Sequence, residues 1–463
     1  MTTPRRPNVL FLMSDEHRFD VAGFAGDELV RTPVLDDLAR DSVVFDNAYT
    51  PAPICIPGRQ AMMAGQFPRH CGVERFGEDL APGHLTFARQ LARFGYRTVA
   101  AGKLHHLGAD QAQGWTHLIG MESGVSPPHI AGLDEQSYCG LPTPATHKWS
   151  QLTEVKRAGI GRSPYVARDE YTVAGALQYI HEHFVDTYYD RAIPEVPLLL
   201  KVSLHQPHYP YLTPHQDLFE YYLNRVPLYE EQQLFDHPVL GGDRHVVRSG
   251  VEVSRREQRR AVAAYYAMVE TADRLFGRVL DALRHAGQDL DDWVIVFTSD
   301  HGEMLGQHGV WEKQRFFEGS VRVPLLIRWP RRFAARTVTD NVNLCDLFAT
   351  LCELTGVPTP DGLDSRSLVP LMTGDSAQWD DESVSQFDGS RLMIKRGALK
   401  YQFYGDEGPE VLFDLDIDPA ELRNLATDSD YAATMTSFRR RRDELGFAAE
   451  SPGIAAPAAR DPK

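Results

Sequence analysis

Apolar runs of strand length alternate with amphipathic runs of helical period along most of this chain. The expected strands lie at 9–14, 97–101, 198–204, 293–298 and 323–327. The expected helices lie at 32–41, 85–94 and 258–286. Strands that alternate with helices are typical of α/β domains, because neighbouring parallel strands need a crossover connection between them. The pattern therefore predicts an α/β fold with a large, mostly parallel central sheet flanked by helices.

The pattern changes after about residue 372. Short alternating runs followed by a helical run predict a smaller antiparallel sheet plus helix, at 392–396, 399–403, 411–415 and 431–445. We expect an α/β domain, a small C-terminal α+β subdomain and a flexible tail, at 1–372, 373–450 and 451–463. Residues 123–168 are rich in Pro, Gly, Ser and His, which predicts a long insertion over the edge of the sheet.

The composition limits the classes of protein to which the chain can belong. It has 463 residues, 43% of them hydrophobic, which is enough for a sizeable core. Its formal net charge of −16 argues against non-specific binding to nucleic acid or to an anionic membrane. No apolar run approaches membrane-spanning length, and the five irregularly spaced cysteines indicate no disulfide framework. We therefore expect a cytoplasmic protein that binds neither nucleic acid nor a membrane.

Four of the expected strands end in polar, reactive residues. They are followed by Asp15-Glu16, Lys103 with His105 and His106, His205 with His208, and Asp300-His301. In open α/β sheets, ligands bind beyond the carboxyl ends of the strands. We therefore expect these residues to converge on one site.

Asp15, Glu16, Asp300 and His301 supply hard oxygen ligands and one imidazole. Such a set suits a divalent cation such as Ca²⁺, Mg²⁺ or Mn²⁺. A single aspartate after a strand is explained equally well as a helix cap. Two such pairs after two apolar strands favour a metal site.

Cys55 begins the run Cys55-Ile56-Pro57-Gly58-Arg59 in a proline-rich loop. Residues 57–64 then read as a helix with proline near its first position. A residue just before a helix N-terminus sits in a positive field, and a bound oxyanion can use the free N–H groups there. A buried, inert cysteine is the alternative that this pattern leaves open.

Lys103 and Lys313 are candidates for binding an anion, although a solvated surface charge explains a single lysine equally well. His208 lies in the turn Pro207-His208-Tyr209-Pro210. A stiff turn suits a proton donor that must keep its orientation. Residues 123–168 are the expected recognition segment for the leaving group, with His147, Trp149, Tyr209 and Tyr211 as candidates.

Together these motifs resemble a sulfatase of the alkaline phosphatase superfamily over nearly the whole chain. The resemblance rests on residues 8–15, the Cys55 run, 102–105, 207–210, 298–303, Lys313, 412–415, 418–419 and 424–425. It implies an alkaline phosphatase-like fold. It also implies that Cys55 is oxidised to formylglycine by a formylglycine-generating enzyme, and that a hydroxyl of the aldehyde hydrate attacks the sulfur of a sulfate ester.

The resemblance also assigns roles to residues of this chain. One divalent cation would be held by Asp15, Glu16, Cys55, Asp300 and His301. The catalytic set would be Cys55, Arg59, Lys103, His105, His208 and Lys313. In this set Lys103 and Lys313 would stabilise charge on the sulfuryl oxygens, and His208 would protonate the leaving alcohol. His105 would be the base that lets the hydrate expel sulfate, and Arg59 would hold the diol.

The sequence departs from the common pattern of the family at three places. Glu16 stands where a second aspartate is usual, and Gln60-Ala61 stands where Ala-Ser is commoner. His301 stands where asparagine is usual. The pair Asp300-His301 resembles the phosphonate monoester hydrolase and choline-sulfatase branches of the family. The histidine makes Mn²⁺ an alternative to Ca²⁺ as the expected cation.

The first hypothesis is thus hydrolysis of a small anionic sulfate ester, with an aryl or small alkyl leaving group. The second is a phosphonate monoester or phosphodiester hydrolase with the same nucleophile, because both reacting centres are tetrahedral and anionic. A metal-stabilised binding scaffold without activity would need a missing catalytic residue, and the sequence lacks none. The relatives suggest a homo-oligomer.

Overall fold

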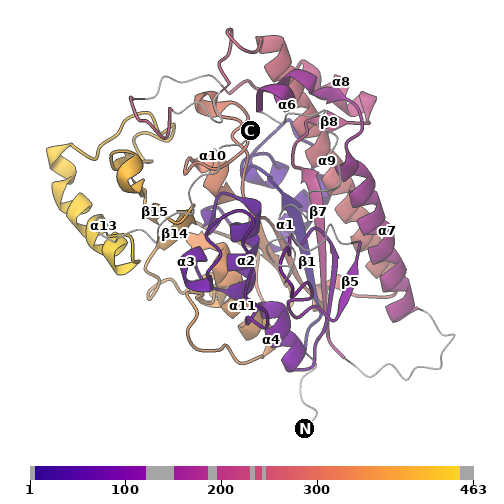
Figure 1. Cartoon of the computed structure of the whole chain (residues 1–463). Coiled ribbons are helices and arrows are strands. Elements are labelled where there is room, and N and C mark those ends of the chain that lie inside the picture. The colour runs from indigo at the N-terminus through magenta and orange to yellow at the C-terminus, as the bar shows by residue number, and fades with distance from the viewer. Residues whose placement is uncertain (1–5, 121–150, 186–195, 230–234, 242–246, 449–463) are drawn as a thin grey trace, which may run out of the picture.

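The computed structural model describes residues 6–120, 151–185, 196–229, 235–241 and 247–448. An eight-stranded central sheet runs through the largest part of the molecule (Figure 1). Its strands in spatial order are β12 (Arg336–Val338), β2 (Ser42–Phe45), β11 (Leu325–Arg328), β9 (Val294–Ser299), β1 (Val9–Asp15), β7 (Leu198–Pro207), β4 (Arg97–Gly102) and β5 (His117–Ile119).

The sheet is mostly parallel, as the sequence predicted. The run from β9 to β5 is parallel throughout, with Leu10 of β1 paired to Leu200 of β7 and Ile295 of β9. The expected strand at 323–327 corresponds to β10 (Arg322–Val323) and β11, and β11 runs antiparallel to both of its neighbours. Alternate side chains of β1 enter opposite cores, because successive residues of a strand face opposite sides.

Helices cover both faces of this sheet (Figure 1). Leu10 and Leu12 pack with α1 (Pro33–Arg40), α7 (Pro164–Phe184) and α9 (Arg255–His285). Phe11 and Met13 pack with α2 (Cys55–Ala64), α4 (Phe87–Arg93) and α11 (Leu347–Thr355). The result is a three-layer α/β architecture with the sheet in the middle.

A separate four-stranded antiparallel sheet forms the C-terminal part, and this confirms the second element of the expected fold. Its strands are β14 (Glu382–Phe387), β15 (Arg391–Arg396), β16 (Leu399–Phe403) and β17 (Val411–Asp414). Helix α13 (Ala432–Glu444) packs on it, and the ring of Phe438 stacks on Tyr401 at 5.4 Å.

Shorter elements complete the described structure. The helices are α3 (Pro68–Cys71), α6 (Gln151–Arg157), α8 (Gln216–Leu223), α10 (Glu318–Val321) and α12 (Val369–Thr373). The strands are β3 (Ala48–Tyr49), β6 (Gly159–Ile160), β8 (Leu212–Thr213) and β13 (Val342–Asn343). Among the described residues, no helix has both the length and the apolar character needed to cross a bilayer.

Two local predictions need correction. The end of the segment expected as an irregular insertion is regular, because residues 151–168 include α6 and the start of α7. The weak periodicity of the segment did not indicate these helices. The rest of it, with His147 and Trp149, lies outside the described residues. Cys55 is the first residue of α2 rather than part of the preceding loop, with Ile54 as its N-cap.

Candidate active site

The site lies where parallel strands of the central sheet end side by side. β4, β7, β1 and β9 are consecutive neighbours in the sheet. Lys103, His208, Asp15 and Asp300 lie at or just beyond their carboxyl ends. The fold therefore brings together the four groups of polar residues that the sequence places after strands, as expected for an open α/β sheet.

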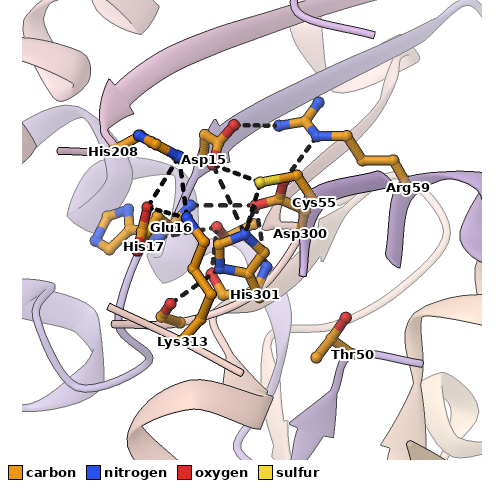
Figure 2. Close-up of polar contacts among 12 residues, drawn as sticks. Asp15, Glu16, His17, Thr50, Cys55, Arg59, His208, Asp300, His301 and Lys313 are labelled. Atoms are coloured by element: carbon orange, nitrogen blue, oxygen red, sulfur yellow. Dashed lines mark hydrogen bonds and ion pairs between the residues drawn. The ribbon is translucent and has the colours of Figure 1, made fainter. Parts of the chain in front are cut away.

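Cys55 directs its thiol into a cluster of potential metal ligands (Figure 2). Its Sγ lies 3.1 Å from His301 Nε2 and 3.9 Å from Asp15 Oδ1. Donor atoms of Asp15, Cys55, Asp300 and His301 all lie within 4.8 Å of one another, and all four residues are buried. Four of the five expected metal ligands thus form one compact group.

The imidazole of His301 has one nitrogen tied to the backbone. Its Nδ1 lies 3.0 Å from the carbonyl oxygen of Gly302, so Nδ1–H donates to that oxygen. The lone pair of Nε2 therefore faces Cys55 and Asp15. A backbone carbonyl that fixes the ring in this way is typical of histidines that bind metals.

Arg59 connects the two carboxylates of this cluster. Its Nε donates to Asp300 Oδ2 at 2.7 Å, and its Nη2 donates to Asp15 Oδ2 at 3.2 Å. Its Nη1 donates to the carbonyl of Lys103 at 2.8 Å and to Ser203 Oγ at 2.9 Å. The rigid fork of a guanidinium thus fixes both carboxylates and two strand ends at once.

Glu16 turns away from the Cys55 cluster and joins a second group. Its backbone is left-handed, at φ 62°, and its Oε2 accepts from Lys313 Nζ at 2.7 Å. The same oxygen lies 3.2 Å from His208 Nε2, which is 3.0 Å from Lys313 Nζ. Donor atoms of Asp15, Glu16 and His208 form a second candidate ligand group, so the role of Glu16 as a ligand stays a prediction.

Lys103 and His105 follow β4 directly. A Cβ on Gly102, at φ 88°, would collide with the Ser203 carbonyl, so the turn that delivers Lys103 needs glycine. The ammonium of Lys103 pairs with Asp15. The ring of His105 stands edge-on to Phe76 at 5.8 Å, at the half-buried rim of the site.

The charges of the cluster favour ionised carboxylates and a neutral imidazole. Although burial opposes it, Lys103 and Arg59 hold the pKa of Asp15 well below its ordinary value. Burial also opposes ionisation of Asp300, but Arg59 and Lys103 together with His301 lower the pKa of this carboxyl. Burial lowers the pKa of His301 to about 4, so the ring is neutral near pH 7. The two carboxylates supply the oxygen donors that a hard divalent cation prefers, and the neutral imidazole adds one nitrogen donor, so these residues fit such an ion.

The Cys55 thiol is a poor nucleophile in this setting. Burial, with Asp15 and Asp300 nearby, raises its pKa, and the two lysines do not offset this effect. Reactive cysteines need a thiolate and therefore lie where the pKa is lowered. The surroundings of Cys55 therefore favour the neutral thiol over the thiolate.

Some residues of the site were missed from the sequence. Ser203 contacts Arg59, and Asp169 of α7 holds the backbone and ring of His205 at the end of β7. A signal existed for Ser203, because it is polar within an apolar strand and shares a face with His205. Tyr211, expected near the leaving group, is buried and donates to Glu303 at 3.1 Å.

Comparisons with known proteins agree with this arrangement. The family model described as sulfatase matches residues 7–357, and one described as N-sulphoglucosamine sulphohydrolase, C-terminal, matches residues 306–446. The choline-sulfatase of Rhizobium meliloti is 30% identical over 95% of this chain and 87% of its own length. The arylsulfatase of Clostridium perfringens is 26% identical over 94% of this chain and 93% of its own length.

A solved structure shares the fold. The phosphonate monoester hydrolase of Agrobacterium radiobacter superposes with a TM-score of 0.76 at 23% identity, and the match covers 95% of each chain. This likeness supports the alkaline phosphatase-like architecture. With the sulfatase match spanning most of the chain and the Cys55 cluster at the strand ends, the protein belongs to the sulfatase family of hydrolases.

Proposed function

We propose that the protein hydrolyses a small sulfate monoester with an aryl or small alkyl leaving group. The observation that carries the proposal is the position of Cys55. Its side chain lies within the Asp15, Asp300 and His301 cluster, and the buried ammonium groups of Lys313 and Lys103 are near enough to act on it electrostatically. A small tetrahedral anion is the ligand that such a charge pattern suits.

The proposal requires Cys55 to be oxidised to formylglycine by a formylglycine-generating enzyme. The raised pKa of the thiol supports this, because the unmodified side chain is a poor nucleophile. A divalent cation, Ca²⁺ or Mn²⁺, held by Asp15, Asp300 and His301 would make a hydroxyl of the hydrated aldehyde more acidic and so a better nucleophile. Arg59 fixes Asp15 and Asp300 so that their geometry does not depend on the substrate.

Lys103 and Lys313 would bind the sulfuryl oxygens, where negative charge grows in the transition state. Both side chains are buried, and each ammonium is already oriented by a carboxylate, Asp15 for one and Glu16 for the other. Oriented cations in a site that excludes water stabilise developing charge more strongly than cations in bulk solvent.

His208 would protonate the leaving oxygen through Nε2. Its Nδ1 lies 2.5 Å from the carbonyl of Tyr209, which leaves Nε2 facing the site. Burial, with Lys313 and Lys103 nearby, lowers the pKa of His208. An anionic ester bound at both lysines offsets their repulsion and favours the imidazolium that donates the proton. His105, at the rim, is the proposed base for the release of sulfate.

Mass spectrometry of the peptide that contains position 55 tests the modification. We expect an aldehyde mass from cells that make the modifying enzyme. We further expect Cys55→Ala to abolish sulfatase turnover with the fold intact, whereas Cys71→Ala, which removes another buried thiol, retains it. Active enzyme with an intact thiol at position 55, or wild-type rates in Cys55→Ala, would refute the proposal.

A phosphonate monoester or phosphodiester hydrolase is the second candidate. The observation that favours it is His301 in the ligand cluster, together with a fold shared with a phosphonate monoester hydrolase. Comparing kcat/KM for 4-nitrophenyl sulfate and for a phenylphosphonate ester separates the two. A preference for the phosphonate by orders of magnitude would reverse the ranking.

A further inference from the structure

Helix α7 presents two side chains to the end of β7. Tyr165 and Asp169 lie four residues apart in its first two turns, so they share one face of the helix. This face packs on the sheet beside β7, which leads directly into the turn that contains His208 (Figure 1). Helix α7 therefore packs next to the strand that leads to His208, the proposed proton donor.

Asp169 clamps the end of β7. Its Oδ1 accepts from the backbone N–H of His205 at 2.7 Å and from His205 Nδ1 at 2.9 Å. Its Oδ2 accepts from the backbone N–H of Gln206 at 2.9 Å and from the Gln206 side-chain amide at 3.2 Å. Asp169 and His205 are both fully buried. Four bonds to one carboxylate fix this strand end and the plane of the His205 ring.

The ring of Tyr165 contacts the rings of both His205 and His208. It stacks on the His205 ring with centroids 4.8 Å apart and planes 13° apart. It meets the His208 ring edge-to-face, at 5.4 Å and 86°. The backbone N–H of His208 also donates to the His205 carbonyl at 2.8 Å. His208 is thus held through its backbone by His205 and through its ring by Tyr165.

We propose that Tyr165 and Asp169 are positioning residues that keep His208 aimed at the leaving oxygen. The inference rests on the proposed role of His208 as the acid (Figure 2). A proton donor contributes only while it stays within hydrogen-bond reach of the reacting oxygen. Small misplacements of reacting groups lower the rate by large factors. Loss of the contacts that Tyr165 and Asp169 make should therefore weaken proton transfer specifically.

The leaving group provides the test. Unsubstituted phenolate leaves poorly and needs the proton, whereas 4-nitrophenolate leaves well without it. For Tyr165→Ala we expect kcat to fall about tenfold or more with phenyl sulfate and less than about twofold with 4-nitrophenyl sulfate. Tyr165→Phe keeps the stacked ring and should remain close to wild type with both esters.

Asp169→Asn should show the same dependence on the leaving group, because it weakens the clamp on His205. Asp273→Asn is the matched control. Asp273 is also a buried carboxylate that accepts backbone N–H groups, from Leu35 at 2.8 Å and Val34 at 3.2 Å, but it lies on α9 against α1. This control should change kcat for both esters by the same factor.

His208→Asn separates the two proposals. Suppose that His208→Asn lowers kcat more for phenyl sulfate than for 4-nitrophenyl sulfate, while Tyr165→Ala lowers kcat for both esters equally or not at all. The positioning role of Tyr165 and Asp169 is then wrong, and the acid role of His208 stands. If His208→Asn itself lowers kcat for both esters by the same factor, the acid role of His208 is wrong, and the positioning role of Tyr165 and Asp169 is wrong with it. Circular dichroism and thermal unfolding show whether each variant folds, and Asp169→Asn keeps the test decisive if Tyr165→Ala does not fold.

Discussion

At the scale of single residues, each cation in the site is matched to a carboxylate. Lys103 pairs with Asp15, Lys313 with Glu16, and Arg59 with both Asp15 and Asp300. A buried charge costs several kcal/mol unless a partner and hydrogen bonds compensate it. The pairing therefore lets a buried site hold many charges while the positions of its groups stay fixed.

The first prediction concerns Arg59→Met. It should lower the free energy of unfolding by about 3–5 kcal/mol, because two buried carboxylates lose their shared partner. Urea titration measures the change. Arg284→Met removes an exposed pair with Asp281 and should change stability by less than about 1 kcal/mol. Equal effects of the two substitutions would show that Arg59 does not compensate the buried charges.

The second prediction concerns Asp300→Asn. The substitution removes a negative ligand from the Cys55 cluster, so the purified variant should hold much less divalent cation than the wild type. Elemental analysis measures the content. Asp169→Asn, outside the cluster, serves as the control. Undiminished cation content in Asp300→Asn would exclude Asp300 from the ligands.

At the scale of elements, the C-terminal sheet supports the loop that contains Lys313. Lys400 of β16 donates to Glu318 of α10 at 2.9 Å and to Glu421 at 2.6 Å, and all three side chains are buried. Tyr49 of β3 also donates to Glu318, at 3.1 Å. Since α10 begins five residues after Lys313, this cluster connects the second sheet to the segment that contains Lys313.

The third prediction follows from this connection. Lys400→Met should leave two buried carboxylates without their cation and cost about 3–5 kcal/mol of unfolding free energy. It should also lower sulfatase kcat, because the Lys313 loop loses its anchor. Arg440→Met, on the exposed side of α13, provides a control in which neither quantity changes. Unchanged stability in Lys400→Met would contradict the prediction.

At the scale of the whole molecule, two cores lie on opposite faces of the central sheet, and the C-terminal sheet beside it has a core of its own (Figure 1). Buried charges lie where these units meet, so the stability of the molecule should depend on pH. Burial raises the pKa of Glu421 from its ordinary value of 4.5 to about 7, although Lys400 opposes this. The folded protein therefore binds a proton at Glu421 more tightly than the unfolded chain does.

The fourth prediction is the sign of this dependence. A raised folded-state pKa stabilises the fold fully below the unfolded value, and this contribution is lost as the pH rises through the folded value. The Glu421 contribution should therefore decrease between pH 4.5 and 7. Urea titrations of wild type and Glu421→Gln across this window measure it. If the difference between the two proteins does not change with pH, Glu421 is not the group responsible.

The sequence by itself determined the fold class and most of the site. Periodicity identified β1, β4, β7 and β9, and the polar residues after them identified the candidate metal-ligand cluster, because residues that follow parallel strands lie at one edge of the sheet. These inferences use only local spacing and one topological rule. The C-terminal sheet was predicted for the same reason, since alternation is visible along each strand.

Only the tertiary structure decided which partner each of these groups takes. Glu16 follows Asp15 directly, yet its left-handed backbone sends it to Lys313 and His208 rather than to Cys55. Asp169 and Tyr165 gave no signal, because their contacts with β7 depend on how α7 packs across the sheet. Side-chain direction and long-range packing depend on the whole folded chain, so no local pattern specifies them.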